Sequence, residues 1–133
     1  MADSMRVPVS FGEVLDKITI LEIKSERIGD PEKLANIGHE LEELNRVWEQ
    51  KLSDPEKVRQ EREELKGVNE ALWEIEDAIR EHEAAGDFGD QFIELARSVY
   101  FTNDQRAVIK KRVNLALGSR FVEEKSYQDY SRR

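Results

Sequence analysis

The sequence predicts an all-α protein: a helical bundle built on a long antiparallel coiled-coil hairpin, with a capped N-terminal helix and two shorter C-terminal helices. Three observations predict this class. Apolar residues step by three and four through the middle of the chain, and capping residues mark the helix starts. The 133 residues, 38% of them apolar, suffice for one domain with a genuine core. We therefore expect residues 1–133 to form a single helical domain.

The first helix is expected over residues 11–28. Ser10 is followed three residues later by Glu13, which is the capping-box pattern, and Pro8 keeps the preceding residues extended. Its apolar residues occupy more than one face: Phe11, Val14, Leu15, Ile18, Ile20, Leu21, Ile23 and Ile28. Such a helix needs covering on two sides, which favours a homo-oligomer.

Residues 31–52 and 55–84 are expected to form the antiparallel hairpin. Each segment follows an Asp-Pro start signal, Asp30-Pro31 and Asp54-Pro55. Their apolar residues follow heptad spacing: Leu34, Ile37, Leu41, Leu44 and Trp48 in the first, and Val58, Leu65, Val68, Leu72, Ile75 and Ile79 in the second. Two such helices joined by a short turn should fold back on each other.

The C-terminal region, residues 88–118, is expected to contain two short helices. Two glycines in AAGDFGD mark the hinge before them. Thr102 and Gln105 make a second capping box, which predicts a helix start there, and Gly118 ends that helix. The tail, residues 119–133, has no helical period, although a few extended residues around Phe121 and Val122 would be compatible with it.

The charge is unevenly distributed along the chain. Residues 1–96 carry 12 Lys and Arg against 25 Asp and Glu, a balance of −13, whereas residues 97–133 carry 9 against 4, a balance of +5. This distribution argues against duplex nucleic acid as a partner, because duplex binding needs a broad cationic face. Cysteine is absent and no apolar run approaches the roughly 20 residues of a membrane helix. The N-terminus lacks the apolar core of a secretory signal, so we expect a cytoplasmic protein with no membrane partner.

The basic segment TNDQRAVIKKRVN, residues 102–114, is the main functional candidate. On a helix, one stripe of its surface carries four polar side chains: Asn103, Arg106, Lys110 and Asn114. Together with the free N–H groups of a helix start at Thr102, this stripe predicts a non-enzymatic binding module for a small anionic ligand, such as a nucleotide or sugar phosphate, and no cofactor. Further binding residues are expected to be Arg97, Lys125 and Tyr127. The alternative is that the basic region docks on the acidic helices of its own chain or of a neighbour.

Four segments resemble a family of short bacterial and phage proteins of unknown function, some of them encoded beside genes for surface sugar assembly. These segments are VPVSFGEVLDKITILEIKSERI, LWEIEDAIR, FIELARSVYFTNDQRAVIKKRVN and VEEKSY. The resemblance implies that the recurrent polar residues are Glu13, Asp16, Lys17, Glu22, Lys24, Arg27, Trp73, Glu76, Asp77, Arg80, Arg97, Asn103, Asp104, Arg106, Lys110, Glu123, Lys125, Ser126 and Tyr127. A phage-borne member would use such residues to sequester a host nucleotide at a subunit interface.

Two other functions remain open. The stretch VLDKITILEIKSERI loosely resembles the first helix of the all-helical chorismate mutases, which would make Lys17, Lys24 and Arg27 the clamps of a cofactor-free enzyme. Against this, those enzymes have a longer unbroken first helix, whereas the Gly29-Asp30-Pro31 sequence ends this one. The third possibility is an adaptor whose hairpin tip, near Asp54, docks a partner protein.

A metal site is not expected. The carboxylates of Glu76, Asp77 and Glu83 are close in sequence, but Arg80 lies between them on the helix face and should neutralise them by i,i+4 contacts. The two histidines, His39 and His82, lack the spacing of zinc ligands.

Overall fold

The computed structural model describes residues 3–130 and confirms the all-α class. It contains α1 (Phe11–Arg27), α2 (Pro31–Lys51), the short 3₁₀ helix η1 (Pro55–Val58), α3 (Arg59–Ala85) and α4 (Asp90–Leu117). Residues 3–130 include no strand, and the tail from residue 119 to residue 130 is irregular. None of these helices is long and apolar enough to cross a membrane.

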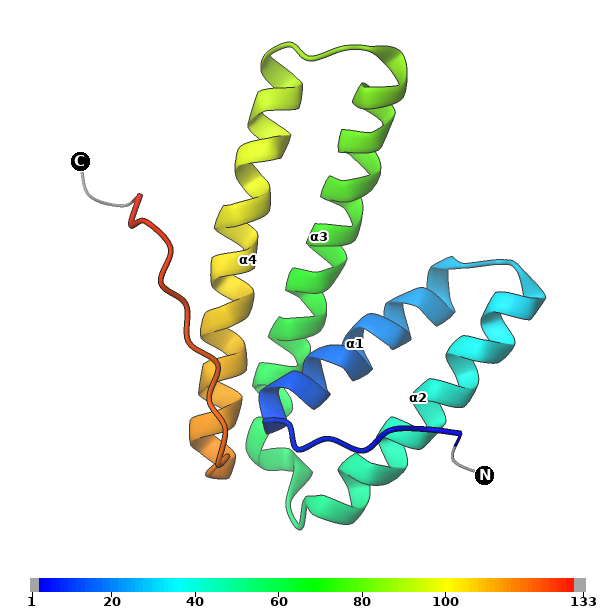
Figure 1. Cartoon of the computed structure of the whole chain (residues 1–133), viewed down its shortest axis with the longest axis vertical. Helices are drawn as coiled ribbons and strands as arrows, with labels where there is room; N and C mark the ends of the chain where they lie inside the picture. Colours follow the sequence, from blue (N-terminus) through cyan, green and yellow to red (C-terminus); the bar gives the residue numbers. More distant parts are fainter. Residues whose placement is uncertain (1–2, 131–133) are drawn as a thin grey trace.

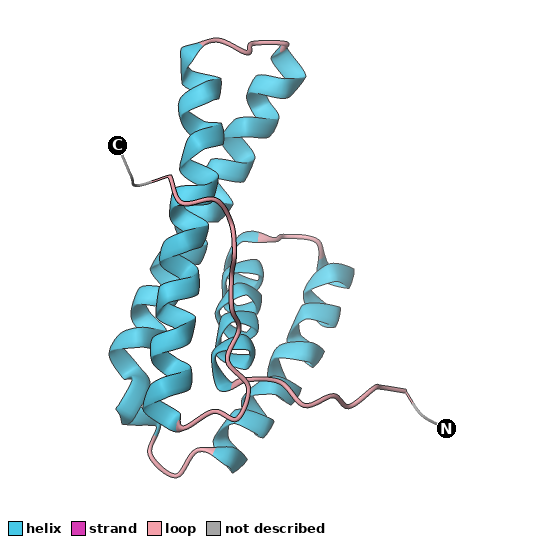
Figure 2. Ribbon diagram, turned by 60° about the vertical axis from the view of Figure 1, so that its left-hand side comes forward, coloured by secondary structure: helices cyan, strands magenta, loops and turns pink. Residues whose placement is uncertain are grey.

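The helices form two hairpins that pack across each other (Figure 1). The long helices α3 and α4 run antiparallel, and their connected ends rise beyond the other helices as an arm. Helix α1 crosses the lower half of this pair, and α2 folds back along the other side of α1. Figure 2 shows that the tail returns along α4 toward the arm. Helix α1 is therefore the central element of the bundle.

The structure contains a long antiparallel hairpin, but it is formed by other helices than those expected. Residues 31–52 were expected to pair with 55–84, whereas α2 packs on α1 and α3 packs on α4. The reason lies in the segment between α2 and α3, which is more than a tight turn. Leu52 and Val58 are buried in the core, and η1 packs against both α3 and α4, so the chain is redirected before α3 begins. The two apolar faces of α1 are covered by α2 and by the α3–α4 pair. These faces therefore no longer indicate a homo-oligomer.

The C-terminal region is one helix, not two. Helix α4 runs without a break from Asp90 to Leu117, so Thr102 and Gln105 lie in its interior. Their capping-box spacing has no effect there, because backbone N–H groups inside a helix already bond to carbonyls four residues back. Residues 90–117 also contain no glycine or proline that would interrupt a helix. The anion site that we expected at a helix start near Thr102 therefore has no free N–H groups.

Three other capping predictions are confirmed, whereas Asp54 precedes only the short helix η1 and its side chain makes no capping hydrogen bond. The Ser10 hydroxyl accepts a hydrogen bond from the Glu13 N–H at 3.1 Å, and the Asp30 carboxylate accepts one from the Glu32 N–H at 3.0 Å. Gly118 ends α4 with a φ of 67°, a conformation that favours glycine. The core that these helices enclose consists of Leu15, Ile18, Trp48, Leu52, Val58, Leu65, Ile109 and Val113.

Candidate functional site

The basic stripe of α4 faces α1 rather than solvent. Arg106 donates hydrogen bonds from Nε and Nη2 to the two carboxylate oxygens of Asp16, at 2.8 and 2.5 Å. Asp16 is only 3% exposed in its side chain, and it accepts a further bond from Asn69 Nδ2 at 3.0 Å. The same Asn69 nitrogen lies 3.0 Å from Thr19 Oγ1. Arg106 is thus held in place by a buried carboxylate of the first helix.

Lys110 is occupied in the same way. Its Nζ lies 2.8 Å from Glu13 Oε2 on α1 and 3.3 Å from Glu123 Oε1 on the tail. The side chain is buried, so these two carboxylates are its immediate surroundings. Glu13 therefore turns toward Lys110 while its own backbone N–H is capped by Ser10. The lysine joins three segments of the chain.

Asn114 caps the start of α1. Its Oδ1 accepts a hydrogen bond from the Gly12 N–H at 2.6 Å, and Ser119 Oγ accepts one from the Phe11 N–H at 3.4 Å. The first N–H groups of α1 are therefore satisfied by the end of α4. The approach requires a glycine: a Cβ added at Gly12 would lie 2.5 Å from the carbonyl oxygen of Lys110.

These contacts explain what the basic stripe does. Three carboxylates, those of Glu13, Asp16 and Glu123, surround the two cations Arg106 and Lys110. The stripe therefore carries no net positive charge, and it can hold an anion only through the hydrogen bonds that its donors still have free. The alternative of docking on acidic residues of the same chain describes Arg106 and Lys110, although their acidic partners lie on the first helix and the tail.

The Arg106–Asp16 ion pair should make the free energy of unfolding depend on pH. Burial raises the pKa of Asp16, but hydrogen bonds from Arg106 and Asn69 and the charges of Arg106 and Lys110 outweigh it, so the pKa lies below its ordinary 3.8. A lowered folded pKa adds stability above the unfolded pKa, and this stability is lost as the pH falls through the folded value. We expect the free energy of unfolding, measured by urea titration, to fall between about pH 5 and pH 2.

Asp16→Asn is the matched variant for this pH dependence. It should be less stable than the native protein at neutral pH. Its free energy of unfolding should also change less between about pH 5 and pH 2, because the carboxylate that titrates is gone. Equal slopes for the two proteins would contradict the assignment to Asp16.

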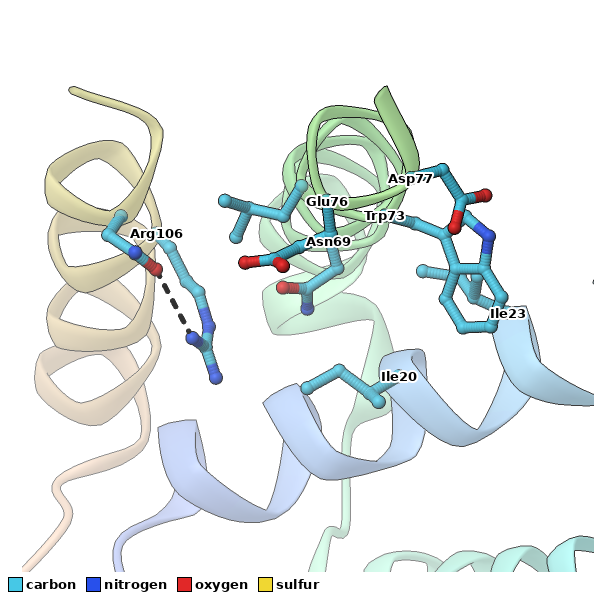
Figure 3. A pocket seen from close by; sticks show the side chains of 9 residues that line it. Ile20, Ile23, Asn69, Trp73, Glu76, Asp77 and Arg106 are labelled. Atoms are coloured by element: carbon cyan, nitrogen blue, oxygen red, sulfur yellow. Dashed lines mark hydrogen bonds between the residues drawn. The ribbon is translucent and has the colours of Figure 1, made fainter. Parts of the chain in front are cut away.

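A groove opens between α1, α3 and α4 next to this ion pair (Figure 3). Its volume is about 430 Å³, which is in the range of small-molecule sites. Arg106 lies at one end, Trp73 and Asp77 lie at the other, and Asn69 and Glu76 lie between them. The complete lining is Ile20, Ile23, Asn69, Leu72, Trp73, Glu76, Asp77, Asn103 and Arg106.

Several polar groups of the groove have hydrogen-bonding capacity left. A guanidinium has five N–H groups, and Arg106 uses two on Asp16 and one, from Nη1, on Asn103 Oδ1 at 3.4 Å. Within residues 3–130, neither the Trp73 indole N–H nor the Asp77 carboxylate has a hydrogen-bond or ion-pair partner. Glu76 is paired with Arg80 at 3.3 Å, as the helix spacing predicted, but the pair is exposed. The groove thus presents donors at one end and acceptors at the other.

A second hollow of about 970 Å³ lies between α4 and the tail, and it collects Asn103, Lys125 and Tyr127. Lys125 Nζ lies 4.0 Å from Asp104 Oδ1 and 5.6 Å from the Tyr127 ring centroid. A hydrogen bond with Asp104 raises the pKa of Tyr130, another lining residue, to about 12. The lysine charge is therefore partly neutralised here too.

The remaining candidate cations do not converge. Arg97 is exposed on the arm, 6.0 Å from the Phe101 ring centroid, and lines neither hollow. Of the three expected clamps on α1, Lys17 pairs with Glu40 on α2 at 3.5 Å and Arg27 pairs with Glu74 on α3 at 3.2 Å. Lys24 lies between them on the helix. Since Lys17 and Arg27 contact opposite neighbours, they do not form one dicarboxylate clamp.

Comparison with known proteins identifies a family for the chain. A family model described as a family of unknown function, DUF6165, matches residues 5–131. The chain belongs to DUF6165. No curated protein and no solved structure gave a significant match. Membership in DUF6165 covers nearly the whole chain and does not assign it an activity.

In this DUF6165 protein, several important residues were not identified as functional from the sequence. Asn69 donates to the buried carboxylate and to Thr19, and Gly12 and Ser119 join α1 to the end of α4. Asn69 had a signal, because it is a polar residue within a heptad helix, between Val68 and Leu72. Gly12 follows an N-cap serine and is the second residue of a helix, where glycine has no propensity advantage.

Proposed function

We propose that the protein is a non-enzymatic binding module for a small phosphorylated ligand that also carries a ring and hydroxyl groups, such as a nucleotide or a sugar phosphate. The ligand occupies the groove between α1, α3 and α4. One observation carries the proposal: a single cavity brings the remaining donors of Arg106 and Asn103 together with the Trp73 indole N–H and the Asp77 carboxylate, neither of which has a hydrogen-bond partner in the described part of the chain.

The fit follows from the two ends of the groove. A base or sugar ring packs on the part of the Trp73 ring that Arg27, 6.0 Å from the ring centroid, leaves open, beside the apolar surface of Ile20, Ile23 and Leu72. Hydroxyl groups donate to the Asp77 and Glu76 carboxylates. The phosphate accepts from the remaining N–H groups of Arg106 and from the Asn103 amide. Asp16 fixes the guanidinium and thereby removes much of the entropy that ordering a free arginine would cost.

The same contacts favour binding over catalysis. Asp16 is the most buried carboxylate beside the groove, and hydrogen bonds from Arg106 and Asn69 engage both of its oxygens. Those bonds hold it in the ionised form and lower its pKa, so it is a weak acceptor for a substrate proton. Such a module acts by sequestering its ligand, and we propose that it does so in the cytoplasm.

Native mass spectrometry of the purified protein, with release of co-purified molecules by denaturation, tests this function. We expect a phosphorylated small molecule, or saturable binding of a member of a panel of nucleoside monophosphates and hexose phosphates. Trp73→Leu should weaken that binding about tenfold, and Asn103→Ala by a similar factor, from the loss of a ring contact and a hydrogen bond.

Two variants serve as controls. Arg97→Ala removes a cation outside the groove, and Tyr127→Ala alters the hollow beside the tail, so neither should change the affinity. An empty protein that binds no member of the panel would refute the function. Binding that depends on Tyr127 and ignores Trp73 would show that the groove is the wrong site.

A further inference from the structure

Helix α4 has a second apolar face, turned away from the bundle. Ile109 and Val113 pack inward into the core, whereas Phe101, Val108 and Leu115 are 39%, 60% and 67% exposed. These three residues, here called the outer stripe, are seven residues apart. Seven-residue spacing keeps apolar side chains on one seam and is typical of a helix that packs along another helix.

No helix among residues 3–130 covers the outer stripe. The elements that α4 contacts most are α3, α1 and η1, which lie on its inner side. The tail follows one edge of α4 (Figure 1), where Tyr130 packs on Phe101 with ring centroids 4.7 Å apart. Val108 and Leu115 remain largely exposed even with the tail in place.

The hollow beside the stripe is suited to receive a side chain. It has a volume of about 510 Å³ and is lined by Phe101, Asp104, Gln105, Val108, Ile109, Arg112 and Tyr130. A coiled-coil interface is built from knobs that enter such holes. Val108 is the exposed knob beside this hollow, and Leu115, one heptad further along the stripe, lies about as far from the middle of α4 as Ile93 does on the other side.

The charges on α4 show which occupant fits. Its N-terminal half carries Asp90, Glu94 and Asp104 against Arg97, whereas residues 105–117 carry four cations and no acid. Of these cations, Lys111 and Arg112 are about half exposed, in ion pairs with Glu124 and Glu64. Two copies of α4 in antiparallel orientation place the acidic half of each against the basic half of the other. A parallel pair would place like charges together.

We propose that two copies of this chain associate through the outer stripe, with their α4 helices antiparallel. The contact is isologous, so each stripe supplies both knobs and holes to the other. The stripe and the ligand groove lie on different faces of α4, and this inference does not depend on the proposed ligand.

Sedimentation velocity over a range of concentrations tests the association. We expect a monomer–dimer equilibrium for the native chain. Val108→Glu should raise the dimer dissociation constant about 100-fold, because each dimer loses the burial of two valines. Val47→Glu is the matched control: it changes a valine that is 42% exposed on α2, so it should leave the equilibrium unchanged. Both variants should fold, since both valines are exposed in the monomer.

The orientation can be tested because the chain has no cysteine. An antiparallel pair should cross-link an Ile93→Cys chain to a Leu115→Cys chain, whereas a parallel pair would cross-link Leu115→Cys to itself. A native protein that stays monomeric at all concentrations would overturn the proposal. A dimer that is insensitive to Val108→Glu, or that cross-links through Leu115→Cys alone, would overturn it as well.

Discussion

Arg106→Met is expected to lower the free energy of unfolding by about 3–5 kcal/mol, because it leaves the buried Asp16 carboxylate without its cation. The methionine replaces much of the arginine stem, so the loss comes mainly from the charge. Urea denaturation followed by circular dichroism measures it. Asp16 would retain only the Asn69 hydrogen bond and the more distant charge of Lys110.

Two further variants make this result specific. Arg112→Met removes an arginine from the same helix, but from an exposed ion pair with Glu64, and should cost less than about 1 kcal/mol. Combining Arg106→Met with Asp16→Leu removes both charges and should recover most of the loss. If Arg106→Met and Arg112→Met have equal effects, the Arg106–Asp16 pair does not hold α4 on α1.

Gly12→Ala is expected to destabilise the protein by about 1–3 kcal/mol, although alanine is a better helix former than glycine. The added Cβ would lie 2.5 Å from a backbone oxygen of α4, which cannot move independently of its helix. Separating the two helices would also break the hydrogen bond from the Gly12 N–H to Asn114. The midpoint of thermal unfolding provides the comparison.

Gly67→Ala is the control for that substitution. Gly67 lies inside α3, and a Cβ added there would have no neighbouring atom within 4 Å, so the same change should stabilise the protein by up to about 1 kcal/mol. Opposite signs for the two variants would identify close approach as the cause. A stabilising Gly12→Ala would contradict the crossing of α1 and α4.

The helices were predictable because their signals are local. Ser10, Asp30 and Gly118 cap helices as their residue types predict. The pairing of the helices was not predictable in this way, because an apolar stripe does not identify its partner. The stripe of α2 fits any neighbouring apolar surface, and the burial of Leu52 and Val58 directs it to α1.

The candidate site was predicted in part for the same reason. Helical spacing correctly placed Asn103, Arg106, Lys110 and Asn114 on one stripe, but it could not show that Asp16 and Glu13 lie opposite, 90 and 97 residues away in sequence. The groove itself depends on three helices. Trp73 and Asp77 are recognised as groove residues only once the fold places α3 beside Arg106.

The most direct test of the binding function uses the two tryptophans of the chain. Trp73 lines the groove, whereas Trp48 is buried in the core and serves as an internal control. In a ¹⁵N-labelled sample, titration with the ligand released from the protein, or with the panel compound that binds best, should shift the Trp73 indole N–H resonance and leave that of Trp48 in place. Saturation that shifts neither resonance, or shifts only residues of the tail, would contradict ligand binding in the groove.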